Sequence, residues 1–161
     1  MQKPKIRTGI GYDVHKLEKG ESFWLGGIEI EHHKGCVGHS DGDTLIHAIA
    51  DALLGAANLG DIGLHFPDSS VKYKNMDSKI ILADTCKLLR KKGYEIGNID
   101  TVIALQKPKI KPYIAKMQNV LAETMSIGHE DISIKATTTE KLGFVGEEKG
   151  IAAYANVLIF G

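Results

Sequence analysis

The chain lacks several features that mark secreted proteins and proteins that bind nucleic acids. It has only two cysteines in 161 residues, Cys36 and Cys86, and they form no CxxC pair. Small secreted domains usually carry several disulfides, so this scarcity favours a reducing, cytoplasmic location. Lys plus Arg and Asp plus Glu each total 20. No overall positive charge therefore attracts nucleic acid or an anionic membrane, and any phosphate site must be local.

Long apolar runs are also missing. The longest, residues 151–160, is about half of the roughly 20 residues that cross a bilayer. The first five residues, MQKPK, lack the apolar core of a signal peptide. Neither internal repeats nor Pro/Ser-rich linkers divide the chain. With 43% hydrophobic residues it can bury a substantial core. We expect a single domain over residues 1–161 that does not enter a membrane.

The hydrophobic pattern predicts an α+β fold. Three segments combine a helical apolar stripe with capping or ending signals: one starts at Ser40 or Asp41 and ends near Gly60, the next starts at Asp77 or Ser78 and ends at Gly93, and the third spans 112–125. Strands are predicted at 7–15, 99–106, 132–136 and 152–160, with a hairpin over 23–30. We expect a mixed β-sheet with helices packed on one face. The final strand is apolar at nearly every position, which suggests burial on both faces, and one face could be a subunit interface.

The first candidate site lies in the sequence GYDVH at residues 11–15. In an extended strand, side chains two residues apart point to the same side, so Asp13 and His15 would converge as half of a metal site. An Asp-x-His triplet is common by chance and needs support from elsewhere in the chain.

That support comes from the sequence HSDGDTLIH at residues 39–47, which gathers polar and ionisable groups at a helix start. His47 lies one helical turn before Asp51, whose carboxylate could orient the imidazole. Asp13, His15 and His47 would then bind Zn²⁺ and leave the fourth position open, as in catalytic zinc sites. The alternative is a solvent-exposed helix start at which His47 only caps or packs.

Three other segments suit phosphate or polyol groups. KPKIKP at 107–112 places three cations and free backbone amides at a helix start, where anions bind. ATTTEK at 136–141 offers three hydroxyls and then Glu140, which could hold Mg²⁺ or Mn²⁺ against a diphosphate. The turns at 60–63 and 66–70 could bind sugar hydroxyls through their carboxylates. Each segment could equally be an ordinary loop, strand or turn.

Taken together, the motifs have an order and spacing that resemble the 2-C-methyl-D-erythritol 2,4-cyclodiphosphate synthase family over almost the whole chain. The matching segments are DVH at 13–15, HSDGD at 39–43, DALLGA at 51–56, GDIG at 60–63, FPD at 66–68 and ATTTEKLGF at 136–144. The last of these is highly specific.

The resemblance implies a homotrimer with active sites between neighbouring subunits. It also implies a phosphorus–oxygen lyase of the non-mevalonate isoprenoid pathway, which converts 4-diphosphocytidyl-2-C-methyl-D-erythritol 2-phosphate to 2-C-methyl-D-erythritol 2,4-cyclodiphosphate and CMP. By position, Asp13, His15 and His47 resemble the Zn²⁺ ligands of this family. Glu140 resembles the carboxylate that reaches a second ion, Mg²⁺ or Mn²⁺, on the substrate diphosphate.

The remaining site residues are likewise implied by the resemblance. His39 and Thr138 resemble the groups that stabilise the transition state. The implied substrate-binding residues are Asp13, His15, His39, Ser40, Asp61, Gly63, Phe66, Pro67, Asp68, Ser69, Ser70, Leu105, Gln106, Lys107, Pro108, Lys109, Ile110, Lys111, Thr137, Thr138, Thr139, Glu140 and Phe144. Among them, the segment 105–111 would recognise cytosine, largely through backbone groups.

One position departs from the family. Glu147 stands where the family commonly has an arginine, thought to line a trimer cavity that can hold an isoprenoid diphosphate. Glu148 adds a second negative charge, and Lys149 could compensate for only part of it, so we do not expect that cavity ligand. Two other functions remain compatible with the residues: a Zn²⁺-dependent phosphohydrolase or nucleotidyl transferase, and a nucleotide-binding module with a structural metal.

Overall fold

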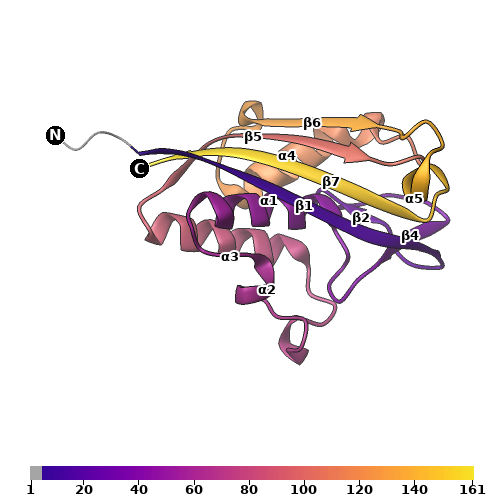
Figure 1. Cartoon of the computed structure of the whole chain (residues 1–161), viewed down its shortest axis with the longest axis horizontal. Helices are drawn as coiled ribbons and strands as arrows, with labels where there is room; N and C mark the ends of the chain where they lie inside the picture. The colour runs from indigo at the N-terminus through magenta and orange to yellow at the C-terminus, as the bar shows by residue number, and fades with distance from the viewer. Residues whose placement is uncertain (1–4) are drawn as a thin grey trace.

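A five-stranded mixed sheet forms one layer of the fold (Figure 1). The computed structural model describes residues 5–161, so residues 1–4, which belong to the segment without a signal-peptide core, lie outside the described residues. The strand order is β4 (Lys34–Val37), β1 (Ile6–Lys19), β7 (Gly150–Phe160), β5 (Glu95–Ala104) and β6 (Ile132–Thr137). Only β5 and β6 run parallel; the other neighbours in this sheet are antiparallel.

A separate hairpin of β2 (Trp24–Leu25) and β3 (Ile28–Glu29) confirms the turn predicted within 23–30. The predicted mixed sheet is also confirmed. The short edge strand β4 was not predicted, because its sequence KGCV has no clear alternation of apolar and polar residues.

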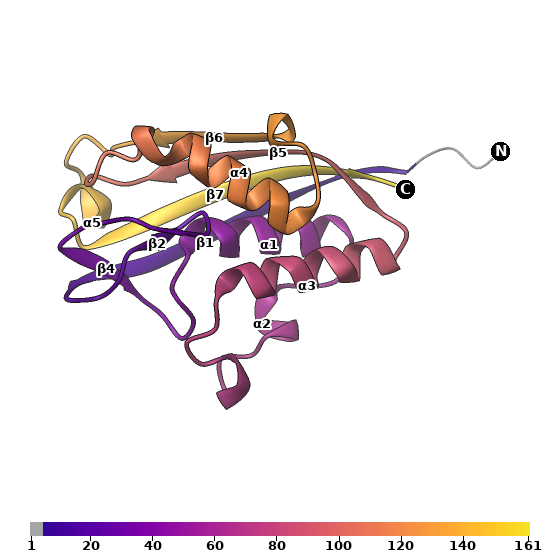
Figure 2. The ribbon, with the colours of Figure 1, turned by 180° about the vertical axis from the view of Figure 1, so that it is seen from behind.

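Three helices form a second layer against one face of the sheet (Figures 1 and 2): α1 (Thr44–Ala56), α3 (Ser78–Lys91) and α4 (Ile114–Met125). Helix α1 lies on β1 and β7, α3 packs on α1, and α4 packs on α3 and β6. The shorter elements are α2 (Ile62–His65), α5 (Gly143–Gly146) and the 3₁₀ turns η1 (Val71–Tyr73), η2 (Lys111–Tyr113) and η3 (His129–Asp131). Within residues 5–161, no helix is both long and apolar enough to cross a membrane.

The start of α1 differs from the prediction. Its N-cap is Asp43, whose side chain accepts a hydrogen bond from the Ile46 N–H, so the prediction of Ser40 or Asp41 is wrong. The side chain of Asp41 is directed instead to the start of α3. The helix ends before the predicted Gly60. By contrast, α3 begins after its predicted cap at 77, and the third predicted helix divides into η2 and α4.

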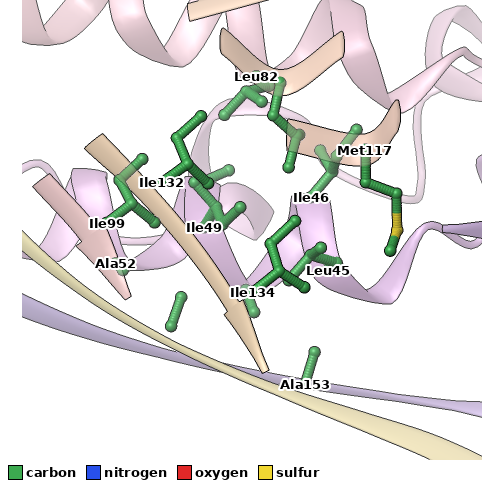
Figure 3. Packing of buried hydrophobic residues seen from close by; sticks show 14 of the residues in the cluster. Leu45, Ile46, Ile49, Ala52, Leu82, Ile99, Met117, Ile132, Ile134 and Ala153 are labelled. Atoms are coloured by element: carbon green, nitrogen blue, oxygen red, sulfur yellow. The ribbon is translucent and has the colours of Figure 1, made fainter. Parts of the chain in front are cut away.

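The hydrophobic core fills the space between the two layers. Figure 3 shows side chains from α1, from the sheet and from the two outer helices meeting there. The labelled residues, all fully or almost fully buried, are Leu45, Ile46, Ile49, Ala52, Leu82, Ile99, Met117, Ile132, Ile134 and Ala153. The core therefore fixes α1 between the sheet on one side and the outer helices on the other.

Two glycines of β1 allow α1 to lie directly against the sheet. A Cβ atom added to Gly9 would lie 2.0 Å from the carbonyl oxygen of Ala52, and one added to Gly11 would lie 1.9 Å from that of Ala48. No side chain fits at these distances. Since Gly11 and Asp13 point to the same side of β1, the close approach also brings α1 within reach of the predicted metal ligands.

The opposite face of the sheet is open and partly apolar. Ile10, Tyr12 and Val14 of β1 and Tyr154 of β7 are between 45% and 76% exposed, and the two tyrosine rings pack with centroids 5.0 Å apart. The final strand was predicted to be buried on both faces, but within a single chain only one of its faces is buried. Soluble proteins seldom leave large contiguous apolar patches exposed.

Replacing Gly11 with alanine should separate α1 from β1. The added methyl group would clash with the backbone of Ala48, so we expect Gly11→Ala to lower the free energy of unfolding by about 3 kcal/mol or more. Gly55, inside α1 with open space around it, is the matched control. Gly55→Ala should raise the same quantity by about 0.5–1 kcal/mol. Urea unfolding measures both, and equal stability of the two variants would contradict this packing.

Candidate metal centre and substrate pockets

Asp13, His15 and His47 meet at the junction of β1 and α1. The Asp13 Oδ2 atom lies 2.9 Å from His15 Nδ1 and 3.2 Å from His47 Nδ1. Each residue offers one ligand atom, and these atoms all lie within 4.8 Å of one another. The predicted convergence of the three residues is confirmed. The alternative in which His47 lies on an exposed helix start is wrong, because its side chain is only 8% exposed.

The charges in this cluster favour a cation. Burial alone would raise the pKa of Asp13, but hydrogen bonds from His15 and His47 outweigh it and hold the pKa of this carboxyl below its ordinary value. Burial alone would lower the pKa of His47, yet its bond to Asp13 and the charges of nearby carboxylates raise it. One carboxylate oxygen and two imidazole nitrogens match the donor set of a catalytic Zn²⁺ ion, so these residues fit that metal.

His47 is oriented by different residues from the one predicted. Its Nε2 atom lies 2.9 Å from the Ser78 Oγ and 3.1 Å from the Ser40 Oγ. The Asp51 carboxylate, predicted to hold this ring, accepts a hydrogen bond from the Ile62 N–H at 2.8 Å instead. Asp51 therefore fixes the start of α2, and the prediction that it orients His47 is wrong.

A cavity of about 170 Å³ opens beside the three ligands. Its lining includes the predicted residues Asp13, His15, His39, Ser40, His47, Gly63, Phe66 and Asp68. Ile62, Tyr73 and Ile81 also line it and were not predicted. Of these, Tyr73 packs edge-on against Phe66 with ring centroids 5.7 Å apart. Tyr73 contributes an apolar ring contact, so no polar or charged motif in the sequence identifies it as a site residue.

The other predicted residues of this region have supporting positions. Asp61 is the N-cap of α2 and accepts a hydrogen bond from the Leu64 N–H. The Ser70 carbonyl lies 3.3 Å from His39 Nε2, so the turn over 66–70, which also carries Pro67 and Ser69, contacts one predicted catalytic side chain.

A second cavity, of about 220 Å³, lies where β5 and β6 end. It is lined by the predicted residues Leu105, Gln106, Pro108, Lys109, Ile110, Lys111, Thr137 and Thr138, and also by Ala136. Lys107, predicted with this group, is not among the lining residues; its ammonium group pairs with Glu148 at 3.2 Å. The structure thus brings nearly all of the predicted nucleotide segment together.

Glu140 lies next to this second cavity, beside one of its lining residues. Its carboxylate is 3.5 Å from the Thr138 hydroxyl, while the Thr139 hydroxyl donates to the carbonyl of Leu142. Phe144, in α5, lines neither cavity and is 45% exposed. The two cavities share no lining residue, and β7 and β5 separate β1 from β6 in the sheet.

The departure at Glu147 lies on an exposed turn after α5. Glu147 forms an ion pair with Lys149, and both side chains are more than half exposed. The positive charge of Lys149 is thus already paired with the negative charge of Glu147, the charge for which it was expected to compensate.

Comparison with known proteins places the chain in a family. The model of the YgbB family matches residues 6–160. The chain belongs to the YgbB family. Two relatives called 2-C-methyl-D-erythritol 2,4-cyclodiphosphate synthase, from Parabacteroides distasonis and Bacteroides fragilis, are each 63% identical to this YgbB chain over 155 residues. The match covers 96% of this chain in both cases, and 96% and 98% of the relatives.

Solved structures of similar sequence share the fold. The bifunctional IspDF from Campylobacter jejuni matches with a TM-score of 0.95 and 41% identity; the match covers 98% of this chain and 43% of that longer chain. The IspF of Plasmodium falciparum, solved as a CDP complex, matches with a TM-score of 0.84 and 38% identity over 96% of this chain and 95% of its own.

Asp43 has a structural role in the polar segment 39–47. It is fully buried, and its carboxylate accepts hydrogen bonds from the backbone amides of Gly26, Gly27 and Ile46. It therefore ties the turn of the β2–β3 hairpin to the start of α1, while the histidines of the same segment face the first cavity.

We expect Asp43→Ala to lower the free energy of unfolding by about 3 kcal/mol, because three amides lose their acceptor at a buried site. The half-exposed cap of α3, Asp77, accepts from the Lys79 N–H and also pairs with the Lys79 ammonium group, so it provides the comparison. Asp77→Ala should cost about 1 kcal/mol. Thermal and urea unfolding would test the difference, and a smaller loss for Asp43→Ala than for Asp77→Ala would refute it.

Proposed function

We propose that this chain is a phosphorus–oxygen lyase of isoprenoid precursor synthesis. It converts 4-diphosphocytidyl-2-C-methyl-D-erythritol 2-phosphate to 2-C-methyl-D-erythritol 2,4-cyclodiphosphate and CMP. The observation that carries this proposal is the Asp13–His15–His47 cluster beside a cavity, in a chain 63% identical over 155 residues to synthases of that name. The free, buried cysteines Cys36 and Cys86 support a cytoplasmic location.

The reaction needs no nucleophile from the protein. An oxygen of the substrate's 2-phosphate attacks the β-phosphorus, a new P–O bond closes the ring, and the bond to CMP breaks with its electrons leaving on CMP. The task of the protein is therefore to hold the two phosphates in line and to stabilise charge.

Two metal ions belong to the proposal. Asp13, His15 and His47 would hold Zn²⁺, and Glu140 together with the substrate diphosphate would hold Mg²⁺ or Mn²⁺. When bound there, Zn²⁺ supplies a Lewis acid for the β-phosphate, and the second ion neutralises charge on the diphosphate. The Glu140 carboxylate and the Thr138 hydroxyl lie close together and are both exposed, so both can reach a ligand.

The chain's own groups would bind and orient the rest of the substrate. The first cavity, with Ser40, Gly63 and Asp68, would take the methylerythritol phosphate. The second cavity would take the cytosine against Ile110 and the backbone around it, with Lys109 near the phosphates. His39 and Thr138, one in each cavity, would donate hydrogen bonds to the phosphoryl oxygens as charge shifts.

We also propose a homotrimer in which the first cavity of one subunit faces the second cavity of its neighbour. Two observations support it. The open sheet face carries exposed apolar side chains on β1 and β7, which association would remove from water. Within one chain the two cavities share no lining residue, so a substrate that needs both can be held where two chains meet.

Release of CMP tests the function directly. Purified protein is stripped of metal and assayed with the CDP-linked substrate before and after Zn²⁺ and Mg²⁺ are restored, and the second product is identified by mass. His47→Ala should lose bound Zn²⁺ and lower the rate by about 100-fold or more, because a site with three donors cannot lose one. His129→Ala, at an exposed histidine far along the chain, should change neither the bound Zn²⁺ nor the rate. A linear product would instead favour a hydrolase. If no CMP were released, a binding module would be favoured.

Mixed assemblies test the shared site. His47→Ala and Glu140→Ala should each be inactive alone, yet random co-assembly should recover about a quarter of the wild-type sites, where one subunit supplies His47 and its neighbour Glu140. Co-assembly of His47→Ala with Asp13→Ala should stay inactive, since both lesions lie in the same cluster. No recovery in the first mixture, or a mass other than three chains by sedimentation, would contradict the trimer.

A further inference from the structure

We infer that Ser78, held by Asp41, is a positioning residue that sets His47 in the tautomer a metal requires. The inference rests on the proposed role of His47 as a metal ligand. Neither Ser78 nor Asp41 belongs to the predicted site, and Ser78 lies 31 residues away from His47 in the sequence, at the first turn of α3.

Ser78 has only one way to use its hydroxyl hydrogen. The residue is fully buried, its backbone N–H donates to Asp41 Oδ2 at 2.9 Å, and its hydroxyl donates to Asp41 Oδ1. A carboxylate only accepts hydrogen bonds, so the hydrogen of Ser78 is committed to it. The Ser78 oxygen can then only accept, from the Ser40 hydroxyl 3.4 Å away and from its nearest remaining neighbour.

That neighbour is His47. Its Nε2 atom lies 2.9 Å from the Ser78 oxygen, so Nε2 must carry a hydrogen to make this bond. Nδ1 faces Asp13 Oδ2 at 3.2 Å and donates to it when no metal is bound; once a metal ion takes the place of that hydrogen, the neutral ring keeps its hydrogen on Nε2 and offers the Nδ1 lone pair to the metal. Metal-bound histidines are commonly fixed in this way by an acceptor on the far nitrogen.

Ser40 does not replace this control. Its hydroxyl also lies near His47 Nε2, at 3.1 Å, but no carboxylate within residues 5–161 fixes its hydrogen, which can point to His47 or to the Ser78 oxygen 3.4 Å away. Ser40 alone could therefore donate to Nε2 as easily as accept from it, and the first of these arrangements would put the hydrogen on Nδ1. Only the Ser78 oxygen is held as an acceptor.

The carboxylate of Asp41 is itself held in place. Its Oδ1 atom also accepts from the Asp43 N–H at 3.1 Å, and the Asp41 N–H donates to the Met76 carbonyl at 3.2 Å. The Asp41 carboxylate therefore joins the loop before α1 to the start of α3. It holds the Ser78 oxygen in a fixed position beside the His47 imidazole.

Ser78→Ala tests the inference through metal affinity. Without the oxygen acceptor, we expect Zn²⁺ affinity, measured by competition with a chromophoric chelator, to fall by about 10- to 100-fold. The d–d bands of the Co²⁺-loaded protein should also change. Thr85→Val is the matched control, because Thr85 is fully buried in the same helix and its hydroxyl has no hydrogen-bond partner among residues 5–161. This variant should keep wild-type affinity and spectrum.

Asp41→Ala tests the same chain of hydrogen bonds at its other end. Without the carboxylate, the hydroxyl hydrogen of Ser78 is free to donate to His47 Nε2, and the ring hydrogen would then remain on Nδ1. We expect the ¹⁵N shifts of His47 in metal-free protein to move toward the Nδ1–H tautomer, with a similar loss of affinity. Ser78→Ala combined with Asp41→Ala should lose little more Zn²⁺ affinity than either variant alone.

Unchanged Zn²⁺ affinity in Ser78→Ala, or an equal loss in Thr85→Val, would overturn the inference. Circular dichroism and unfolding of the metal-free variants check that each one folds. If Ser78→Ala does not fold, the tautomer shift in Asp41→Ala decides the question, and its absence would also overturn the inference. A wild-type protein that binds no Zn²⁺ would refute the proposed metal site itself, which is a separate and recognisable result.

Discussion

The structure depends on the contact between the backbone of β1 and the backbone of α1. Gly9 and Gly11 present no side chain to the helix, and the small residues Ala48 and Ala52 face them. Because the two backbones lie so close, a ligand pair on the strand and a single ligand on the helix can converge within a few ångströms. A larger residue at either glycine would move the two parts of the cluster apart before it altered any ligand.

Local sequence could predict those parts of the site that depend on local geometry. Asp13 and His15 share a strand face because they are two residues apart, and the segment 105–111 forms one cavity because its residues are contiguous. The polar segment 39–47 supplied the third ligand, His47, and the family resemblance indicated the same residue. Both sources pointed to the same cluster, which the structure confirms.

The errors arose where tertiary contacts choose between equivalent local signals. Asp41 and Asp43 are both sound N-caps by sequence, and only the position of the β2–β3 turn and of α3 assigns the capping role to Asp43. Asp51 lies at helical spacing from His47, but the amide of Ile62 takes its carboxylate. The hydroxyl that does reach His47 comes from another helix, and no spacing rule predicts a partner so distant in sequence.

Alternate residues of β1 serve two different purposes. Asp13 and His15 point toward α1, while Tyr12 and Val14 point to the open face that we propose as the subunit interface. In the proposed trimer, the pleat of one strand would therefore join the metal site to the subunit interface. A substitution at Tyr12 that reshaped the proposed contact would also shift the peptide units beside Asp13, so activity would fall although no catalytic side chain had changed. This strand is consequently less free to evolve than an ordinary interface strand, because each of its residues has a neighbour with a different function.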